Sequence, residues 1–352
     1  MIFQKHFAFV FFLSFASSGL YAQVTGGRHS FAFLELSPSA RATALGGTQI
    51  AVRDDELAFA ALNPAALNAS MSGRLTFNHN FYLGDIQHGY AAYGHSFGKK
   101  RYTLHAGVQY TDYGTIQRAD VFGTTSGEIK AKETAVTAGL GRPLSDRLSI
   151  GLNVKWAAST LDAWQSSALA ADAGLLYVDT ARLYSVAMVV RNTGAQLNGY
   201  ASDKTSGLPV DVQMAYSKRL RHLPFRLTVV AHHLHQWDIR FDDPALEDDE
   251  FLNFDGSSNE PKGAPGVDNF FRHLIFSGEF LLGKTESFRL RVAYNHLRKR
   301  ELSVNNYRSL AGFSGGVGIK INRFRVDMGY GAYHLAGGVV HLGIGTNLRE
   351  FF

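Results

Sequence analysis

Two short motifs contain a serine in surroundings that some enzymes use for nucleophilic catalysis. Gly312–Gly316 matches the nucleophile-elbow pattern of hydrolases, which requires a sharp turn between a strand and a helix. Apolar residues continue to alternate at Val317 and Ile319, so we interpret Ser314 as part of a glycine-rich strand. Ser96–Lys99 has the serine–lysine spacing of penicillin-binding enzymes, but the sequence lacks the Ser-Asp-Asn and Lys-Thr-Gly motifs that accompany it there. The sequence therefore predicts no catalytic residues and no enzyme.

Histidines gather at His232, His233 and His235, where they could suggest a metal site. If this stretch is a strand, only His233 and His235 share a face, and a tight zinc site usually has three or four ligands. The chain contains no cysteine, which excludes disulfides and cysteine-based zinc sites. We therefore expect these histidines to be polar residues of the rim or interior, and we expect no metal and no other cofactor.

A long acidic and aromatic segment, Ile239–Phe270, is a candidate surface for a partner. Its length is unusual for a simple connection, charge on a loop can steer a partner, and aromatic residues can anchor one. A solvated loop is the simpler interpretation, and the twelve-residue spacing of an EF-hand calcium loop is missing. The residues that we predict to bind the partner are Asp242, Asp243, Glu247, Asp248, Asp249, Glu250, Phe251 and Phe254.

The charge pattern argues against a nucleic-acid partner. The formal net charge is +5, and no basic run is long enough to form a stripe along a nucleic acid. The cluster Arg298–Arg300 lies between two predicted strands, so we expect it in a solvated loop.

The elements that carry these residues are predicted to be long strands. Apolar residues alternate with polar or small ones in Leu148–Trp156, Phe288–Tyr294 and Phe324–Tyr330, which is typical of β-strands. Most predicted strands reach the roughly 9–11 residues that a tilted membrane strand needs, whereas strands of soluble proteins average about 5–6. We count fourteen strands, starting near Gly73, His88, Arg101, Lys132, Arg147, Ser166, Arg182, Leu208, Leu223, Phe271, Ser287, Leu310, Phe324 and Gly338.

Short turns alternate with longer connections along the chain, as in outer-membrane barrels with short periplasmic turns and long extracellular loops. The last strand carries apolar residues on one face up to a terminal aromatic residue, Phe352. The predicted short turns are Gly98–Lys100, Leu144–Asp146, Asp179–Ala181, Gly283–Glu286 and Asn322–Arg323, and the predicted longer loops are Tyr113–Ala131, Gly194–Gly207, Ile239–Phe270 and Lys299–Ser309.

These patterns predict an all-β fold, namely a fourteen-stranded antiparallel transmembrane β-barrel formed by residues 73–352 in the outer membrane. A soluble β-sandwich also has alternating strands, but strand length and loop asymmetry fit it less well. Residues 1–22 are predicted to be a signal peptide, with Lys5 as its positive residue, an apolar stretch at Phe7–Phe15 and cleavage after Ala22.

Residues 23–72 differ from the strands and are predicted to form a hatch inside the barrel. Ser39 can cap a short helix, Ala40–Leu45, that the following glycines end. Asp54 or Asp55 can cap a second helix, Glu56–Leu62, before Asn63 and Pro64 break it. The lumen of so large a barrel is too wide for its own side chains to fill. Asp54 and Asp55 could bind a cation or anchor this hatch to luminal arginines, for which the candidates are Arg289, Arg291 and Arg325.

The segment Ser37–Leu67 resembles the N-terminal hatch of the fatty-acid-transporter-like barrels, a superfamily with fourteen strands. The residues that carry this resemblance are Ala40–Arg41, Ala44–Gly47, Asp54–Asp55 and Asn63–Ala65. The resemblance implies a hatch that includes Arg41, Asp54, Asp55, Asn63 and Pro64, and it implies a channel for hydrophobic molecules as one possible function.

A longer stretch, residues 26–240, resembles the PorQ family within the PorV/PorQ group of type IX secretion proteins of Bacteroidetes. The resemblance implies that the barrel anchors the surface protein PorZ at the cell exterior, within an attachment complex that contains the sortase PorU and the barrel PorV. The residues that carry it are Gly26–Gly27, Phe31, Phe33–Leu34, Pro38–Arg41, Gln109–Tyr110, Asp112–Gly114, Arg191–Gly194, Gln196–Leu197, Leu208–Pro209, His222–Arg226, Leu234 and Gln236–Asp238.

Two functions from different classes therefore stand side by side. The first is an anchor for a surface partner, set in the lipids of the outer membrane, and the second is a channel for hydrophobic molecules. A polar and well-packed lumen would favour the anchor, whereas an apolar tunnel or a lateral gap would favour the channel.

Overall fold

The structure is a computed structural model that describes residues 29–98, 101–120, 122–200, 206–240, 265–283, 285–302, 310–334 and 337–351. The predicted signal peptide, Phe352 and the predicted partner-binding residues from Asp242 to Phe254 lie outside the described residues.

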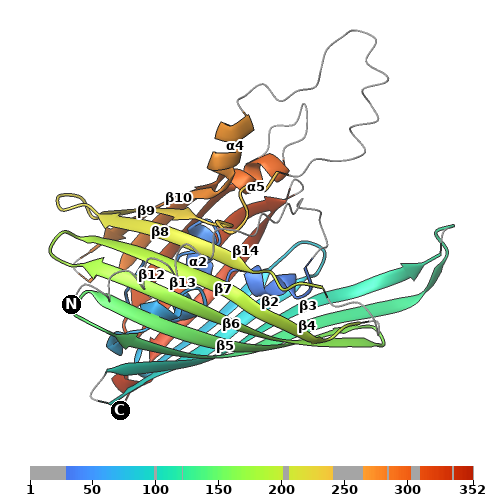
Figure 1. Ribbon diagram of the computed structural model, residues 1–352, viewed down its shortest axis with the longest axis horizontal. Helices are drawn as coiled ribbons and strands as arrows, with labels where there is room; N and C mark the ends of the chain where they lie inside the picture. The colour runs from blue at the N-terminus through green and yellow to red at the C-terminus, as the bar shows by residue number, and fades with distance from the viewer. Residues whose placement is uncertain are drawn as a thin grey trace, which may run out of the picture.

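Fourteen antiparallel strands form one closed barrel, in which each strand pairs with its neighbours in sequence and β1 pairs with β14 (Figure 1). The predicted number of strands and the antiparallel barrel are confirmed. The strands are β1 (Arg74–Phe81), β2 (Gln87–Phe97), β3 (Tyr102–Ala119), β4 (Thr125–Pro143), β5 (Leu148–Leu161), β6 (Trp164–Asp179), β7 (Tyr184–Asn198), β8 (Asp211–Arg219), β9 (Phe225–Ala231), β10 (Leu274–Leu282), β11 (Phe288–Asn295), β12 (Phe313–Ile321), β13 (Phe324–His334) and β14 (Gly337–Asn347).

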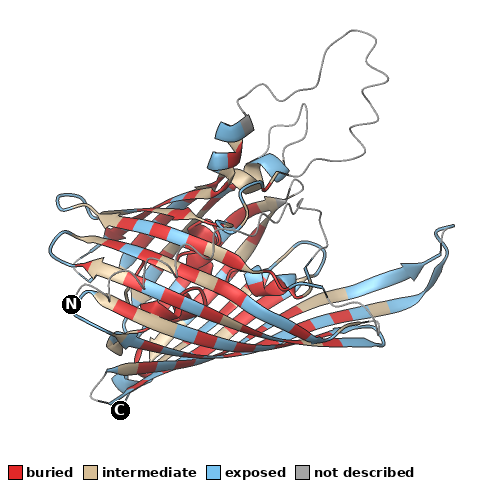
Figure 2. Cartoon of the chain, viewed as in Figure 1, coloured by how far each residue is buried: buried red, intermediate tan, exposed pale blue. Residues whose placement is uncertain are grey.

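The wall of the barrel is apolar outside and polar inside, the reverse of a soluble protein. In β5, Leu152, Val154 and Trp156 are exposed, whereas Asn153 and Lys155 between them are buried. The same alternation recurs along the other strands as bands of exposed and buried residues (Figure 2). Since successive side chains of a strand point to opposite faces, the apolar side chains form an outer belt and the polar ones line the lumen.

The helices fall into two groups and one terminal turn. The first group belongs to residues 29–72, and the second lies at the barrel end that carries the longer connections, here called the long-loop end. The helical elements are η1 (Ala32–Glu35), α2 (Ala40–Ala44), η2 (Leu57–Ala61), η3 (Pro64–Ala66), η4 (Ala69–Met71), α4 (Pro265–Arg272), α5 (His296–Glu301) and η6 (Leu348–Glu350).

The predicted loop Tyr113–Ala131 is wrong, because most of it belongs to a hairpin that projects from the barrel (Figure 1). The ladder between β3 and β4 continues as far as Ala119 and Thr125, with irregularities near Gly114 and Gly127. Both glycines have positive φ angles, of 69° and 141°. Glycine at such positions accommodates an extra residue within a continuing ladder, so these glycines mark bulges and not the ends of the strands.

Three further boundaries differ from the prediction. Gly194 lies within β7, which continues to Asn198, because a glycine there allows close approach of the backbone of β6 at Leu169. The end of the predicted loop Ile239–Phe270 is part of the helix α4. The final strand ends at Asn347, whose side chain accepts a hydrogen bond from the backbone of Arg349 and so begins η6.

Candidate functional site

The described part of the N-terminal segment, residues 29–72, lies against the luminal face of the barrel wall. α2 contacts β1 and β11 to β14, while η3 contacts β4, β5 and β6 on another side of the lumen. Figure 1 shows this segment in blue between the strands. The side chains of Arg41 and Phe59 are fully buried there, so the segment fills space that the wall alone would leave open.

The segment folds into short helical turns, and side chains cap three of them: Ser39 caps α2, Asn63 caps η3 and Asn68 caps η4. The Ser39 hydroxyl accepts a hydrogen bond of 3.2 Å from the backbone N–H of Ala42, as predicted for the start of α2. Gly46 and Gly47 end this helix with φ angles of +95° and +104°. The predicted helix Glu56–Leu62 is instead the shorter 3₁₀ turn η2, which has no side-chain cap. The predicted capping by Asp54 or Asp55 is wrong, because these carboxylates pair with Arg41 and Arg74.

Asn63 and Pro64 fit against the wall at two glycines. The Asn63 side chain donates a 2.8 Å hydrogen bond to the Ile50 carbonyl and accepts one of 3.0 Å from the Ala65 backbone. A Cβ atom at Gly174 would overlap the Asn63 amide, and one at Gly151 would overlap the Pro64 backbone. Absent side chains in the wall therefore provide the space in which this turn is held.

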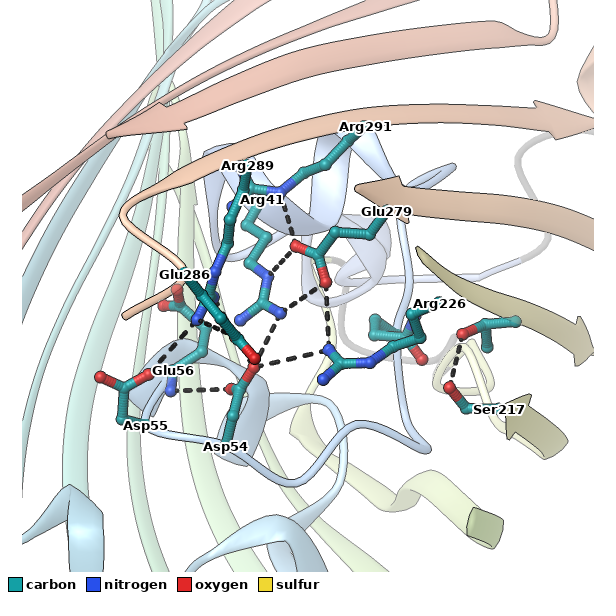
Figure 3. Close-up of polar contacts among 12 residues, drawn as sticks. Arg41, Asp54, Asp55, Glu56, Ser217, Arg226, Glu279, Glu286, Arg289 and Arg291 are labelled. Atoms are coloured by element: carbon teal, nitrogen blue, oxygen red, sulfur yellow. Dashed lines mark hydrogen bonds and ion pairs between the residues drawn. The ribbon is translucent and has the colours of Figure 1, made fainter. Parts of the chain in front are cut away.

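Arg41 is the centre of a luminal ion-pair cluster (Figure 3). Its guanidinium donates two hydrogen bonds of 2.9 Å to the two carboxylate oxygens of Glu279 on β10. The same guanidinium lies 2.7 Å from Asp54 in its own segment. Arg41 thus connects the N-terminal segment to itself and to the wall.

Glu279 also accepts hydrogen bonds from two arginines of the neighbouring strands. Arg226 on β9 donates at 3.0 Å and Arg291 on β11 at 2.9 Å. Arg291 reaches across to Asp327 on β13 at 2.6 Å. One carboxylate therefore joins three guanidinium groups, and all of them face the lumen.

Asp54 and Asp55 extend the cluster toward the barrel end opposite the long-loop end. Asp54 lies 3.7 Å from both Arg226 and Arg289. Asp55 pairs with Arg74 at the start of β1 and lies 4.0 Å from Arg289. Of the three candidate arginines, Arg289 lies within ion-pair distance of both aspartates, whereas Arg291 pairs with Glu279 and Asp327.

Electrostatics explain why such a cluster fixes its members. Charges are costly to bury alone, and removing one partner of a buried pair leaves the other uncompensated. A cavity of about 20 Å³ beside this cluster is lined by Arg41, Arg325 and Asp327, among others, and that volume holds about one water molecule. Because its ion pairs join the segment to the wall, the arrangement holds the segment in place.

At the long-loop end, Asp268 holds α4 against α5. Its carboxylate accepts hydrogen bonds from Arg272 at 2.8 Å, His296 at 3.1 Å and Arg300 at 2.6 Å. Although burial alone would raise it, hydrogen bonds and nearby arginines lower the pKa of Asp268 to about 2. Its stabilising effect is therefore present above its unfolded value near 3.8 and is lost as the pH falls toward 2.

The cluster Arg298–Arg300, predicted to be a solvated loop, belongs to α5. The Asn295 side chain accepts a hydrogen bond of 3.2 Å from the Arg298 backbone and begins this helix. The Arg298 guanidinium stacks 3.6 Å above the Tyr333 ring and reaches the Gly46 carbonyl at 3.4 Å. The prediction was wrong because cation–π stacking and the end of α2 bring this arginine back to the protein.

The histidines near residue 233 brace a turn. β9 ends at Ala231 and His233 has a φ angle of +54°, so the expected strand and its shared face for His233 and His235 are wrong. His273 makes ring-nitrogen contacts of 2.8 and 2.9 Å with the carbonyls of His232 and Trp237. Burial lowers the pKa of His232 to about 3, so its ring is neutral near pH 7. Within the described residues, no group of three or more His, Asp or Glu is arranged to hold a metal ion.

The two serine motifs lie on strands. Ser314 is on β12, directly opposite Ala293 and Gly331, and the strand continues to Ile321 without the elbow that the motif requires. The Ser96 hydroxyl lies 2.9 Å from that of Thr103, while Lys99 is outside the described residues.

None of the helices within the described residues has the length and apolarity that a membrane-crossing helix needs.

Neither a protein-family model nor a curated protein sequence matches this chain. Solved structures match its fold. The monoaromatic hydrocarbon channel CymD has a TM-score of 0.53 at 13% sequence identity, over 89% of this chain and 96% of that one. A deletion mutant of the monoaromatic hydrocarbon channel TodX has a TM-score of 0.53 at 10% identity, over 88% of this chain and 99% of that one. With its closed fourteen-stranded barrel and outward apolar belt, this chain is an integral β-barrel protein of the outer membrane.

Proposed function

We propose that this protein is a closed outer-membrane barrel that anchors a surface partner at its long-loop end. The observation that carries the proposal is the luminal ion-pair cluster, in which Glu279 and Asp54 connect Arg41 to several strands. A segment held by buried charge pairs is suited to keeping the lumen closed, because moving it would expose unpaired charges to a low-dielectric interior.

The long-loop end supports the same proposal. α4 and α5 are fixed to each other through Asp268, and Arg298 connects α5 to Gly46, just after the end of α2. Residues 241–264, which include the predicted partner-binding residues Asp242 to Phe254, connect to this braced rim. A rigid base limits the conformational entropy that binding would remove.

The finer form of the proposal comes from the sequence resemblance to the PorQ family. In that form the partner is a PorZ-like surface protein, and through it the sortase PorU and the barrel PorV, within a type IX attachment complex. The support for this finer form is the resemblance over residues 26–240.

A channel for hydrophobic molecules is the second candidate, and the comparisons support it better than the anchor. Both solved structures reported above are described as hydrocarbon channels. One feature of the wall fits this function. An outward apolar groove of about 430 Å³ and the small luminal cavity share Asn78, Gly343 and Ile344 as lining residues, so only the sheet of β1 and β14 separates them.

The experiment that separates the two uses cells that express either a variant with residues 242–254 replaced by a glycine–serine linker or a control with residues 120–124 replaced in the same way. The fractions of surface partner on cells and in the medium are measured together with uptake of a monoaromatic hydrocarbon. Release of the partner only in the first variant, with uptake unchanged, supports the anchor. Retention of the partner in both variants contradicts it, and reduced uptake in a full deletion strain then supports the channel.

A further inference from the structure

α4 is an amphipathic helix whose apolar face is exposed and whose polar face packs against the protein. Val267, Phe270 and Phe271 are exposed by 56%, 48% and 41%, whereas Asn269 in the same helix is buried at 3%. In water, a contiguous exposed face of large apolar residues is unfavourable and marks an interaction surface. The helix therefore presents its apolar side to something other than the body of the barrel.

Polar contacts on the opposite side prevent α4 from turning this face inward. The Asn269 amide donates a hydrogen bond of 2.5 Å to the Trp237 carbonyl and accepts one of 3.3 Å from the Ile239 backbone. Asp268 bonds to His296 and Arg300 of the neighbouring helix. Rotating the helix to bury its phenylalanines would break all of these bonds, so its orientation is determined by its polar residues.

The apolar face of α4 is continuous with the outer belt of the barrel through a series of aromatic contacts. Ring centroids are 5.6 Å apart from Phe270 to Phe271 and 6.1 Å from Phe271 to His296. They are 5.9 Å apart from His296 to Tyr294 and 4.9 Å from Tyr294 to Phe313.

The last two residues of this series, Tyr294 and Phe313, belong to the wall strands β11 and β12. Tyr294 lies directly opposite Phe276 on β10 and opposite Phe313 on β12. Phe276 and Phe313 are both exposed on the outward face. This row of three aromatic residues, near the long-loop ends of β10 to β12, is placed where outer-membrane barrels carry an aromatic girdle at the lipid–water interface.

We propose that α4 is an interfacial helix whose face of Val267, Phe270 and Phe271 is buried in the outer leaflet of the membrane. The occupant of this face is the boundary between lipid headgroups and acyl chains, since the aromatic series through His296 connects it to the lipid-facing wall. Interfacial helices bury their apolar side at this depth. The proposal is independent of whether the barrel anchors a partner or conducts hydrophobic molecules.

The alternative occupant is a protein, and the lipid is favoured for two reasons. The exposed face of α4 carries no charged side chain, whereas the charged residues of this helix, Asp268 and Arg272, are used in contacts within the protein. The exposed Trp237 stacks on His273 directly beside α4, and tryptophan is enriched at membrane interfaces.

The test uses spin labels on single cysteines, which the absence of native cysteine makes site-specific. Phe270→Cys and Phe271→Cys are labelled in the full chain reconstituted into lipid vesicles. Accessibility of each label to oxygen, which partitions into lipid, is compared with accessibility to a water-soluble nickel chelate. Phe276→Cys on the lipid-facing wall is the matched lipid control, and Phe122→Cys on the projecting hairpin is the matched aqueous control.

We expect the labels at 270 and 271 to have the high oxygen and low nickel accessibility of the label at 276. High nickel accessibility, as at 122, would overturn the proposal and leave the helix as an aqueous surface for a protein. Low accessibility to both reagents would also overturn it, because the face would then be covered by the chain itself. Intact antiparallel sheet by circular dichroism in each variant shows that the barrel has formed.

Discussion

At the scale of single residues, Glu279 is a luminal carboxylate that accepts hydrogen bonds from three arginines. Its carboxylate is nearly fully buried and lies within 3.0 Å of Arg41, Arg226 and Arg291. Replacing it with a neutral group of equal size would leave three guanidinium groups with fewer compensating charges. The loss of stability should therefore be that of breaking a buried ion pair, which is larger than the loss from breaking an exposed one.

We therefore expect Glu279→Gln to lower the free energy of unfolding by about 3–5 kcal/mol. The matched control is Asp238→Asn, which removes the exposed partner of Arg240 and should cost about 0–1 kcal/mol. Urea unfolding of both variants in lipid vesicles gives the comparison. Equal effects of the two substitutions would show that the cluster does not stabilise the barrel.

The sequence predicted one half of this cluster and missed the other. Alternation assigned Arg289, Arg291 and Arg325 to the lumen, and they are buried there. Glu279 was missed, although it lies between Gly278 and Phe280 on the polar side of its strand. Alternation fixes the face of a residue, but its height along the barrel depends on strand register, which decides the pairs and is not readable from one strand.

At the scale of elements, the end of α2 depends on a glycine for two separate reasons. Gly46 has a φ angle of +95°, and a Cβ atom there would overlap the side chain of Ile275 on β10. An alanine would be strained by its backbone conformation and would also push the segment away from the wall.

Gly46→Ala should therefore destabilise the protein more than Gly84→Ala does. Gly84 has a φ angle of +68° but faces open space, so its substitution reports the backbone cost alone, about 1 kcal/mol. Thermal unfolding of the two variants separates the backbone strain from the overlap with Ile275. We expect Gly46→Ala to lower the free energy of unfolding by about 1–3 kcal/mol more than Gly84→Ala does, as at other overpacked sites. No excess would mean that the segment is not packed tightly against β10.

Elements with a regular period were predictable, and those determined by tertiary contacts were not. All fourteen strands follow from alternation, and the start of α2 follows from the Ser39 cap. α4 was missed because its eight residues are held by Asn269 and Asp268 contacts to distant segments. The projecting hairpin was missed because irregularities in its ladder interrupt the period of two.

At the scale of the whole molecule, the closed wall and the luminal segment make a prediction about ion flow. We expect the protein in planar bilayers to carry no steady ion current, since residues 29–72 occupy the lumen and are held by buried ion pairs. A variant that lacks residues 29–72 should conduct, as wide barrels with an unfilled lumen do.

A variant shortened in the projecting hairpin, within residues 115–130, is the matched control and should remain non-conducting. The double substitution Arg41→Ala and Glu279→Ala tests the closure of the lumen without removing any residues, and it should give intermittent current. Steady current from the unmodified protein would contradict the proposal that the lumen is closed.

The pairing of β1 with β14 has a consequence for the order in which the parts of the protein assemble. Residues 29–72 precede the first strand, yet α2 contacts β11 to β14, which are synthesised last. Once the register from Arg74 and Asn347 to Phe81 and Val340 has formed, a folded segment of this size has no route through the wall. α2 can therefore complete its contacts with the wall only after the last four strands have been made. The final strands thus complete both the barrel wall and the packing of the segment inside it.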